Sequence, residues 1–227
     1  ARLVCGGHVI KTDLNTYAST VKSLSVRLIN LIAVANTLEV LCGDVGNAFL
    51  YGKTNEKVYV VAGPEFDKHE GKRMIVDRSL YGLKSSAARF HEHLSVKLRN
   101  LGFRPSKADP DLWLRKTNGY YEYIARFVDD AIAFSKDPMA IMKDLEKNYV
   151  MKGVGKPQYY LGGDVVELND PWNKEGIYTA FSAETYITNC IPKMCEMVGL
   201  VEFKKYKTPL AEDYHPELEE SALLAPA

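Results

Sequence analysis

Two adjacent aspartates, Asp129 and Asp130, are the residues of this 227-residue chain best placed to do chemistry. They lie between residues 121–128 and 131–134, two apolar and aromatic runs with the composition and length of β-strands. The pattern predicts a β-hairpin with both carboxylates at its tip. Ionised carboxylates beside a dry sheet are costly unless they are solvated or paired with a cation, so we expect a divalent metal as their partner.

A third carboxylate, Asp44, follows a short apolar run within residues 41–50. If its strand neighbours the hairpin, three carboxylates converge on one sheet edge. Such a group suits two hard cations about 3.5–4 Å apart, as used for in-line phosphoryl transfer. A simpler interpretation is also open, because aspartates are common in hairpin turns for their tolerance of unusual backbone angles and their bonds to the main chain.

The order of five short segments resembles that of the reverse transcriptases of copia-like LTR retrotransposons. The resemblance extends from residue 1, where the first four residues look like a fingers strand, to about residue 210. The first of the five resembles a catalytic strand, the second contains the Leu-Tyr-Gly-Leu-Lys signature, and the fourth, Phe-Val-Asp-Asp, resembles the aromatic-X-Asp-Asp motif. In chain order the segments are residues 44–49, 79–90, 106–113, 127–130 and 159–164.

This resemblance implies an RNA-directed DNA polymerase that transfers nucleotides from dNTPs to a primer 3′-hydroxyl. It implies two Mg²⁺ ions, for which Mn²⁺ can substitute, with Asp44, Asp129 and Asp130 as catalytic residues and metal ligands. The carbonyl of Val45 is expected to complete the ligand set. One alternative stays open, a catalytically inert or domesticated nucleic-acid-binding palm remnant. A nucleotide-cyclase or RNA-polymerase use of the same palm is a weaker one.

The resemblance also implies a nucleotide site and a primer grip. Phe49, five residues after Asp44, is expected to contact the sugar and exclude a 2′-hydroxyl; its competing interpretation is a plain core aromatic. Further nucleotide contacts are expected from Tyr81, Gly82, Lys84 and Arg2. The expected primer grip comprises Tyr160, Leu161, Gly162 and Gly163.

The implied partners are an RNA template, a DNA or tRNA primer, dNTPs and the rest of a Pol polyprotein, with integrase upstream and RNase H downstream. The chain begins with alanine and contains no apolar run long enough to span a bilayer. We therefore expect an excised intracellular piece without a membrane partner, acting in a cytoplasmic virus-like particle, the nucleus or both. The four cysteines lack Cys-x-x-Cys spacing and are interpreted as reduced thiols.

Charge is unevenly distributed although 29 basic and 29 acidic residues cancel. Basic residues gather between positions 68 and 107, whereas the end beyond residue 211 carries only acids. Phosphate neutralisation dominates affinity for nucleic acid, so we predict contacts from Lys97, Arg99 and Arg104. A solvated helix face is the equally open alternative.

The order of predicted elements indicates an α+β fold. Apolar spacing predicts a helix from about residue 17 to 36. A second helix follows the Tyr-Gly-Leu-Lys turn with Ser85 or Ser86 as its cap, and a third begins at Asp137 and Pro138. Strands are predicted at residues 158–168 and 177–181.

Two finer expectations concern the histidines of the second helix and the last helix. His91 and His93 lie off the apolar stripe of the second helix and are expected at the surface. A last helix opens at Ser182 and is interrupted by Pro192.

By resemblance, the fold is a polymerase palm, an antiparallel sheet backed by helices, with partial fingers and the start of a thumb. Residues 1–37 are expected to form partial fingers and a connecting helix. Residues 38–170 form the palm, with a fingers insertion near 51–80, and residues 171–227 form the start of the thumb or connection with an acidic tail.

Overall fold

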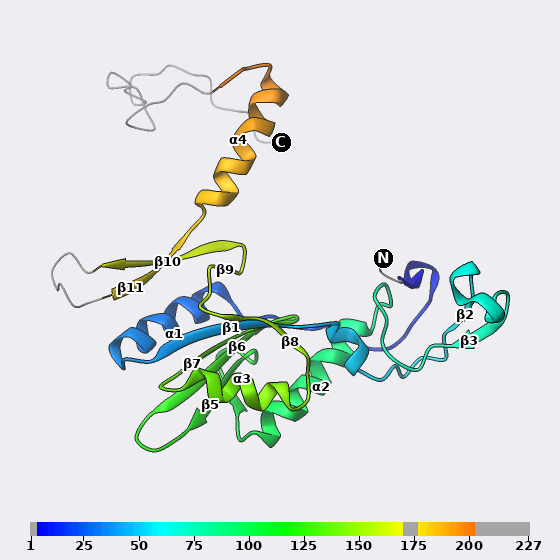
Figure 1. The fold of residues 1–227 in the computed structure, drawn as a ribbon, viewed down its shortest axis with the longest axis horizontal. Helices are drawn as coiled ribbons and strands as arrows, with labels where there is room; N and C mark the ends of the chain where they lie inside the picture. Colours follow the sequence, from blue (N-terminus) through cyan, green and yellow to red (C-terminus); the bar gives the residue numbers. More distant parts are fainter. Residues whose placement is uncertain (1–3, 170–176, 203–227) are drawn as a thin grey trace, which may run out of the picture. The chain divides into compact units, whose positions relative to one another are not determined.

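The structure, a computed structural model, describes residues 4–169 and 177–202 (Figure 1). Arg2 and the acidic tail therefore lie outside the described residues. The chain divides into two compact units, one ending at Ser182 and one beginning at Ala183. The first unit contains every described residue of the expected site.

The main sheet of the first unit has six strands in the order β4-β5-β6-β7-β1-β8, and all neighbours are antiparallel. The predicted hairpin is confirmed, because β6 and β7 pair directly on either side of the two aspartates. The strand of Asp44, β1, is the next neighbour of β7. The strands are β1 (Glu39–Val45), β4 (Arg104–Pro105), β5 (Leu112–Lys116), β6 (Tyr121–Phe127), β7 (Asp130–Ser135) and β8 (Met151–Gly155).

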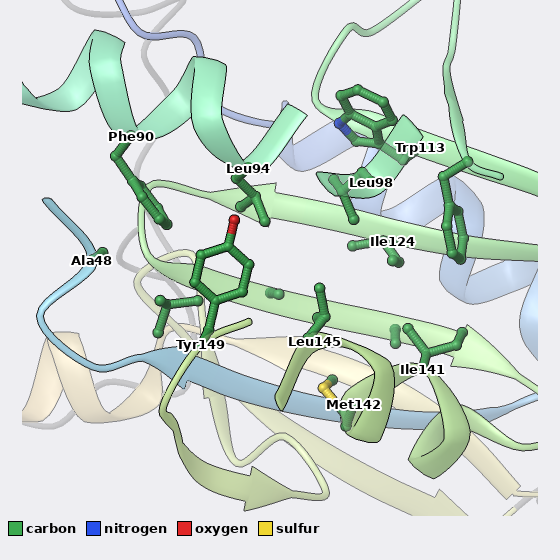
Figure 2. Close-up of a cluster of buried hydrophobic side chains, with 14 residues drawn as sticks. Ala48, Phe90, Leu94, Leu98, Trp113, Ile124, Ile141, Met142, Leu145 and Tyr149 are labelled. Atoms are coloured by element: carbon green, nitrogen blue, oxygen red, sulfur yellow. The ribbon is translucent and has the colours of Figure 1, made fainter. Parts of the chain in front are cut away.

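Helices cover both faces of this sheet. On one face, α2 (Ser86–Asn100) and α3 (Pro138–Glu146) pack over a core that contains Trp113 and Ile124. In Figure 2 the labelled side chains of α2 and α3 lie over the same strands, with Tyr149 between the two sets. On the other face, α1 (Ser23–Ala35) packs through Val26, Ile29 and Ala33. The α+β class is thus as predicted.

Helix α1 is shorter than predicted because the residues before it are used by other elements. Val21 N–H donates to Arg126 O at 3.0 Å, and Lys22 N–H donates to Asp109 Oδ2 at 2.9 Å. Lys22 is extended, so the helix begins at Ser23. The leucines whose spacing predicted the helix, Leu24 and Leu28 among them, lie on its exposed side.

The predicted caps have different outcomes. Asp137 accepts a hydrogen bond from Ala140 N–H at 3.0 Å and precedes Pro138, so the start of α3 is confirmed. Ser85 occupies the predicted N-cap position of α2, but the expected capping hydrogen bond is absent. The Ser86 hydroxyl donates instead to Leu80 O at 2.6 Å in the preceding turn.

Smaller sheets flank the main one. The strands β2 (Tyr59–Val61) and β3 (Arg73–Ile75) pair with each other, and β9 (Tyr159–Tyr160), β10 (Gly163–Asn169) and β11 (Ile177–Ser182) form a second group. The single strand predicted at 158–168 is wrong. Leu161 and Gly162 have φ values of 52° and 80°, which turn the chain back and make two paired strands.

The described part of the first unit, residues 4–169 and 177–182, contains three 3₁₀ turns, η1 (Gly7–Val9), η2 (Ala48–Tyr51) and η3 (Pro64–His69). The helix of the second unit, α4, runs from Glu184 to Val198 and contains Pro192. It begins two residues after Ser182, and the proline removes one N–H donor without ending it, contrary to the predicted interruption. None of the helices within residues 4–169 and 177–202 has the length and apolar content needed to cross a bilayer.

Candidate active site

Asp44 and Asp130 are direct cross-strand partners in the β1–β7 ladder. Asp129 precedes Asp130 in the hairpin turn, and its carbonyl accepts a hydrogen bond from Val45 N–H at 2.9 Å. The turn is thereby tied to the strand that carries Asp44. The structure brings together the sequence positions of the predicted catalytic carboxylates.

The turn that carries Asp129 has an unusual backbone. Phe127 pairs with Asp130, which leaves Val128 and Asp129 as a two-residue loop, and Val128 has a φ of 57°. A β-branched residue is rarely found in this left-handed region. Such a conformation costs on the order of 1–3 kcal/mol and persists where the surrounding structure enforces it. The strained residue, Val128, therefore lies directly before Asp129.

Burial and the charges of neighbouring carboxylates raise the pKa values of Asp44 and Asp130. Burial is the largest cause of the raised pKa of Asp44, followed by the charge of Asp129. Burial likewise raises the pKa of Asp130, with further contributions from Asp129 and Asp44. Burial and the charge of Asp130 also raise the pKa of the Cys42 thiol, two residues before Asp44. The protein alone thus leaves mutually repelling carboxylates at this edge.

Lys152 on β8 is a residue of this site that sequence reasoning missed. It is the partner of Asp44 on the other side of β1, and its charge opposes the rise of the Asp44 pKa. Its stem crosses Gly46, where an added Cβ would lie 2.7 Å from Lys152 Cε. No signal in the sequence placed β8 beside β1, because residues 151–155 are rich in glycine and resemble a loop.

Oxygen donors of this kind suit Mg²⁺ or Mn²⁺, which prefer carboxylate and carbonyl ligands. Within the described residues, no three His, Cys, Asp or Glu side chains already converge as a closed metal cluster. The mutual repulsion of Asp44, Asp129 and Asp130 nevertheless fits a cation, since a divalent ion would remove the cost that raises the pKa values of Asp44 and Asp130.

Phe49 lies in η2, just after the end of β1. Its ring is half-buried against the core of Figure 2 and packs against Tyr81, with ring centroids 4.7 Å apart and planes at 45°. Asn47 makes the turn between strand and ring with a φ of 54°. Two of the predicted nucleotide-binding residues, Phe49 and Tyr81, are therefore in contact.

Gly82 and Lys84 contact the amino-terminal segment of the chain. Gly82 has a φ of 94°, and an added Cβ would lie 2.0 Å from Cys5 O. Reciprocally, a Cβ on Gly7 would lie 2.1 Å from Gly82 O. The Lys84 ammonium donates to Ile10 O at 2.9 Å. In this structure Gly82 and Lys84, both predicted to bind the nucleotide, thus contact the backbone of residues 5–10.

The predicted primer grip forms the β9–β10 hairpin. Gly163 pairs with Tyr160, and Leu161 and Gly162 make the turn between them. Tyr160 is buried, and its hydroxyl donates to Ala125 O on β6 at 3.1 Å. Burial, then the charge of Asp130, raises the pKa of Tyr160. The hairpin therefore packs on the face of the sheet that carries the carboxylates.

The basic residues Lys97, Arg99 and Arg104 lie at and beyond the carboxyl end of α2, whereas the amino half of that helix packs with η2. The Arg99 guanidinium carbon lies 5.4 Å from the centre of the Trp113 ring. Arg104 Nη1 donates to Arg99 O and Phe103 O at 3.1 and 2.8 Å. The structure does not bring these residues to the carboxylates, and nucleic-acid binding by them stays a prediction.

The two histidines of α2 were predicted at the surface, and both are partly buried side chains that contact distant polar groups. His91 Nε2 lies 2.9 Å from Asp111 Oδ1 and 3.2 Å from Ser19 Oγ. His93 Nδ1 lies 3.0 Å from the hydroxyl of Tyr149, and burial, with the charges of Lys97 and Arg78, lowers the pKa of His93. These contacts were not predicted because the partners come from segments distant in sequence.

The fold and site together define an α+β protein with an acidic edge suited to divalent cations. The profile of the family described as reverse transcriptase (RNA-dependent DNA polymerase) matches residues 1–210. The chain therefore belongs to that family.

Relatives agree with this assignment. The retrovirus-related Pol polyprotein from transposon TNT 1-94 of Nicotiana tabacum is 28% identical over 220 residues, 93% of this chain and 16% of that protein. The corresponding polyprotein from transposon RE1 of Arabidopsis thaliana is 28% identical over 170 residues, 71% of this chain and 12% of that protein. A transposon Ty5-1 protein of Saccharomyces cerevisiae is 30% identical over 172 residues, 74% of this chain and 53% of that protein.

The chain thus spans less than a fifth of the two plant polyproteins and about half of the yeast protein. The predicted resemblance to copia-like retrotransposon reverse transcriptases is confirmed.

Proposed function

We propose that this chain is the polymerase core of a retrotransposon Pol polyprotein. Its reaction is the transfer of a nucleotide from a dNTP to the 3′-hydroxyl of a primer paired to an RNA template. The observation that carries the proposal is the direct pairing of Asp44 with Asp130, with Asp129 in the adjoining turn, in a chain of the reverse transcriptase family.

The residues that would hold two Mg²⁺ or Mn²⁺ ions are Asp44, Asp129, Asp130 and the carbonyl of Val45. Bound there, such ions supply Lewis-acid activation of a hydroxyl and neutralise charge on a triphosphate. The carboxylates themselves have the burial and mutual repulsion that make cation binding favourable. Lys152 adds a fixed positive charge beside Asp44.

The rings of Phe49 and Tyr81 form the proposed floor for the incoming deoxynucleotide. Phe49 follows β1 at the end that carries Asp44, so its ring is positioned to discriminate at the sugar by excluded volume. Gly82 and Lys84 are proposed to serve this site by holding residues 5–10 in place, with Arg2 as a further nucleotide contact.

The β9–β10 hairpin, with Tyr160 to Gly163, is the proposed primer grip. Its Tyr160 anchor packs on β6, the strand that leads directly into the carboxylate turn. A primer end on this hairpin would be presented to the same face of the sheet as Asp44 and Asp130.

The wider context is proposed from the relatives. We assign residues 38–170 to a palm with a fingers insertion near 51–80, residues 1–37 to partial fingers and residues 171–227 to the start of a thumb. The template is RNA, the primer is DNA or tRNA, and the neighbouring Pol segments are integrase upstream and RNase H downstream. The proposed place of action is a virus-like particle or the nucleus.

Primer extension tests the proposal. The chain is compared with a longer version that carries its neighbouring Pol sequence, on a primed RNA template with Mg²⁺ and dNTPs. The expected result is extension that needs Mg²⁺ and follows the template, at least in the longer version. If both versions bind the primed template and neither extends the primer, the protein is a nucleic-acid-binding remnant instead.

A further inference from the structure

A buried ion pair includes Arg126, which lies two residues before the turn formed by Val128 and Asp129. The side chains of Arg126 on β6 and Asp111 just before β5 are 1% and 0% exposed. Arg126 Nε donates to Asp111 Oδ1 at 3.0 Å, and Arg126 Nη2 also contacts this oxygen. Arg126 Nη1 donates to His91 O at 3.0 Å and to Ser95 Oγ at 3.1 Å, both on α2. The guanidinium thus binds β6 to a loop and a helix at once.

The backbone of Arg126 is held on both sides as well. Its N–H donates to Asp111 O at 3.1 Å, and its carbonyl accepts from Val21 N–H at 3.0 Å. The neighbouring Asp109 accepts from Lys22 N–H and from Ser25 Oγ, at 2.9 and 2.6 Å, at the start of α1. One polar cluster therefore connects the end of β6 with helices on both faces of the sheet.

Stability alone is a weak reason for such a cluster. A buried ion pair is often no more stabilising than well-packed apolar residues of the same volume, because its charges lose their hydration. Its distinguishing property is geometry, since the planar fork of arginine binds its acceptors in one orientation. A fixed orientation is what the strained turn at Val128 requires, because strain persists only where the surroundings enforce it.

We propose that Arg126 is a positioning residue that, through Asp111, fixes the end of β6 and so keeps Asp129 and Asp130 opposite Asp44. The effect on catalysis rests on the proposed function. The effect on the order of the turn does not, and it can be measured without any activity.

The test replaces the pair by apolar residues, Arg126→Met with Asp111→Leu, so that no unpaired charge stays buried. Thermal stability should stay near that of the parent protein. Hydrogen exchange at Val45 N–H, which donates to Asp129 O, should become about tenfold faster. In primer extension, kcat should fall by about 100-fold, the effect of a misplacement near 1 Å, with little change in the KM for dNTP.

Two further variants complete the experiment. Arg126→Lys keeps the charge but not the fork, so it should fold and show a smaller change in the same direction at Val45. The control, Arg115→Met with Glu122→Leu, removes a pair at 2.7 Å that joins β5 and β6 far from the turn, and it should leave Val45 exchange unchanged.

Parent-like exchange at Val45 in both Arg126 variants would overturn the proposal, whatever the activity. If Val45 exchange is faster in the Arg126 variants but the parent protein does not extend primers, the result supports the positioning role and contradicts the proposed function.

Discussion

Asp44 on β1 and Asp130 on β7 lie directly opposite each other, so two carboxylates form one cross-strand pair of the antiparallel sheet. Like charges in this relationship destabilise a sheet. Burial adds to the cost, as the raised pKa values of both groups show. The arrangement opposes folding in the absence of a cation, which is the property expected of a metal site.

Asp130→Asn should therefore stabilise the protein in the absence of divalent ions. A carboxyl group whose pKa is raised on folding favours the fold below its ordinary pKa, and that contribution is lost as the pH rises through the raised value. We expect a gain of roughly 0.2–1 kcal/mol at pH 7, the range for opposed like charges, and none at pH 3. Urea unfolding in EDTA at both values measures it. Asp77→Asn, an exposed carboxylate, is the control, and an equal gain in that variant would contradict the account.

Asp111 should control how the free energy of unfolding falls at acid pH. Burial alone raises its pKa, but hydrogen bonds from His91 and Ser19 and the Arg126 guanidinium outweigh burial and lower the pKa to about 2. A lowered pKa contributes stability above the ordinary value, which is lost as the pH falls through the folded value. We expect a loss of about 2 kcal/mol from this group between pH 4 and pH 2. In Asp111→Asn the free energy of unfolding should be lower at pH 7 and should change less between pH 4 and pH 2. If it falls as steeply with pH as in the parent protein, the assignment to Asp111 is contradicted.

Phe49→Val should reduce discrimination between dNTP and rNTP. Removing the ring relieves a clash with the 2′-hydroxyl. The ratio of kcat/KM for dNTP to kcat/KM for rNTP should therefore fall, by an amount equivalent to roughly 1–3 kcal/mol of transition-state free energy. The competing interpretation treats Phe49 as a core residue, whose truncation costs about 3–5 kcal/mol of stability and lowers the use of both nucleotides alike. Kinetics with both nucleotides and a denaturation curve separate the two. Unchanged discrimination in a destabilised variant would show that Phe49 is not a sugar gate.

Gly7→Ala should detach the amino-terminal segment from the Tyr81–Gly82 turn, because the new Cβ would lie 2.1 Å from Gly82 O. Hydrogen exchange at Cys5 N–H, which donates to Tyr81 O at 2.7 Å, reports this directly. The KM for dNTP should rise more than kcat falls if this segment serves the nucleotide site. Gly6→Ala is a matched control, since its nearest neighbour would be His8 Cε1 at 3.7 Å. Equal exchange rates at Cys5 N–H in the two variants would show that the close approach of Gly7 to Gly82 does not hold this segment in place.

The sequence predicted those parts of the site that depend on local pattern. Asp129 and Asp130 were placed in a hairpin because strand composition flanks them on both sides, and Asp137 was recognised as a cap from its proline. Lys152 and the partners of His91 were missed because strand order and long-range hydrogen bonds brought them together. The start of helix α1 was predicted too early because Val21 continues the apolar spacing of the helix, whereas the N–H groups of Val21 and Lys22 donate to distant residues.

The most direct test of the central claim is Asp129→Asn in the version of the protein that extends primers. The side chain stays the same size while losing its charge, so melting temperature and primed-template binding should stay close to those of the parent. Incorporation of dNTP in Mg²⁺ should be abolished, because the carboxylate serves the cation and not the core. Primer extension by Asp129→Asn at the parental rate, or loss of activity only together with the fold, would contradict the assignment of this edge as the catalytic metal site.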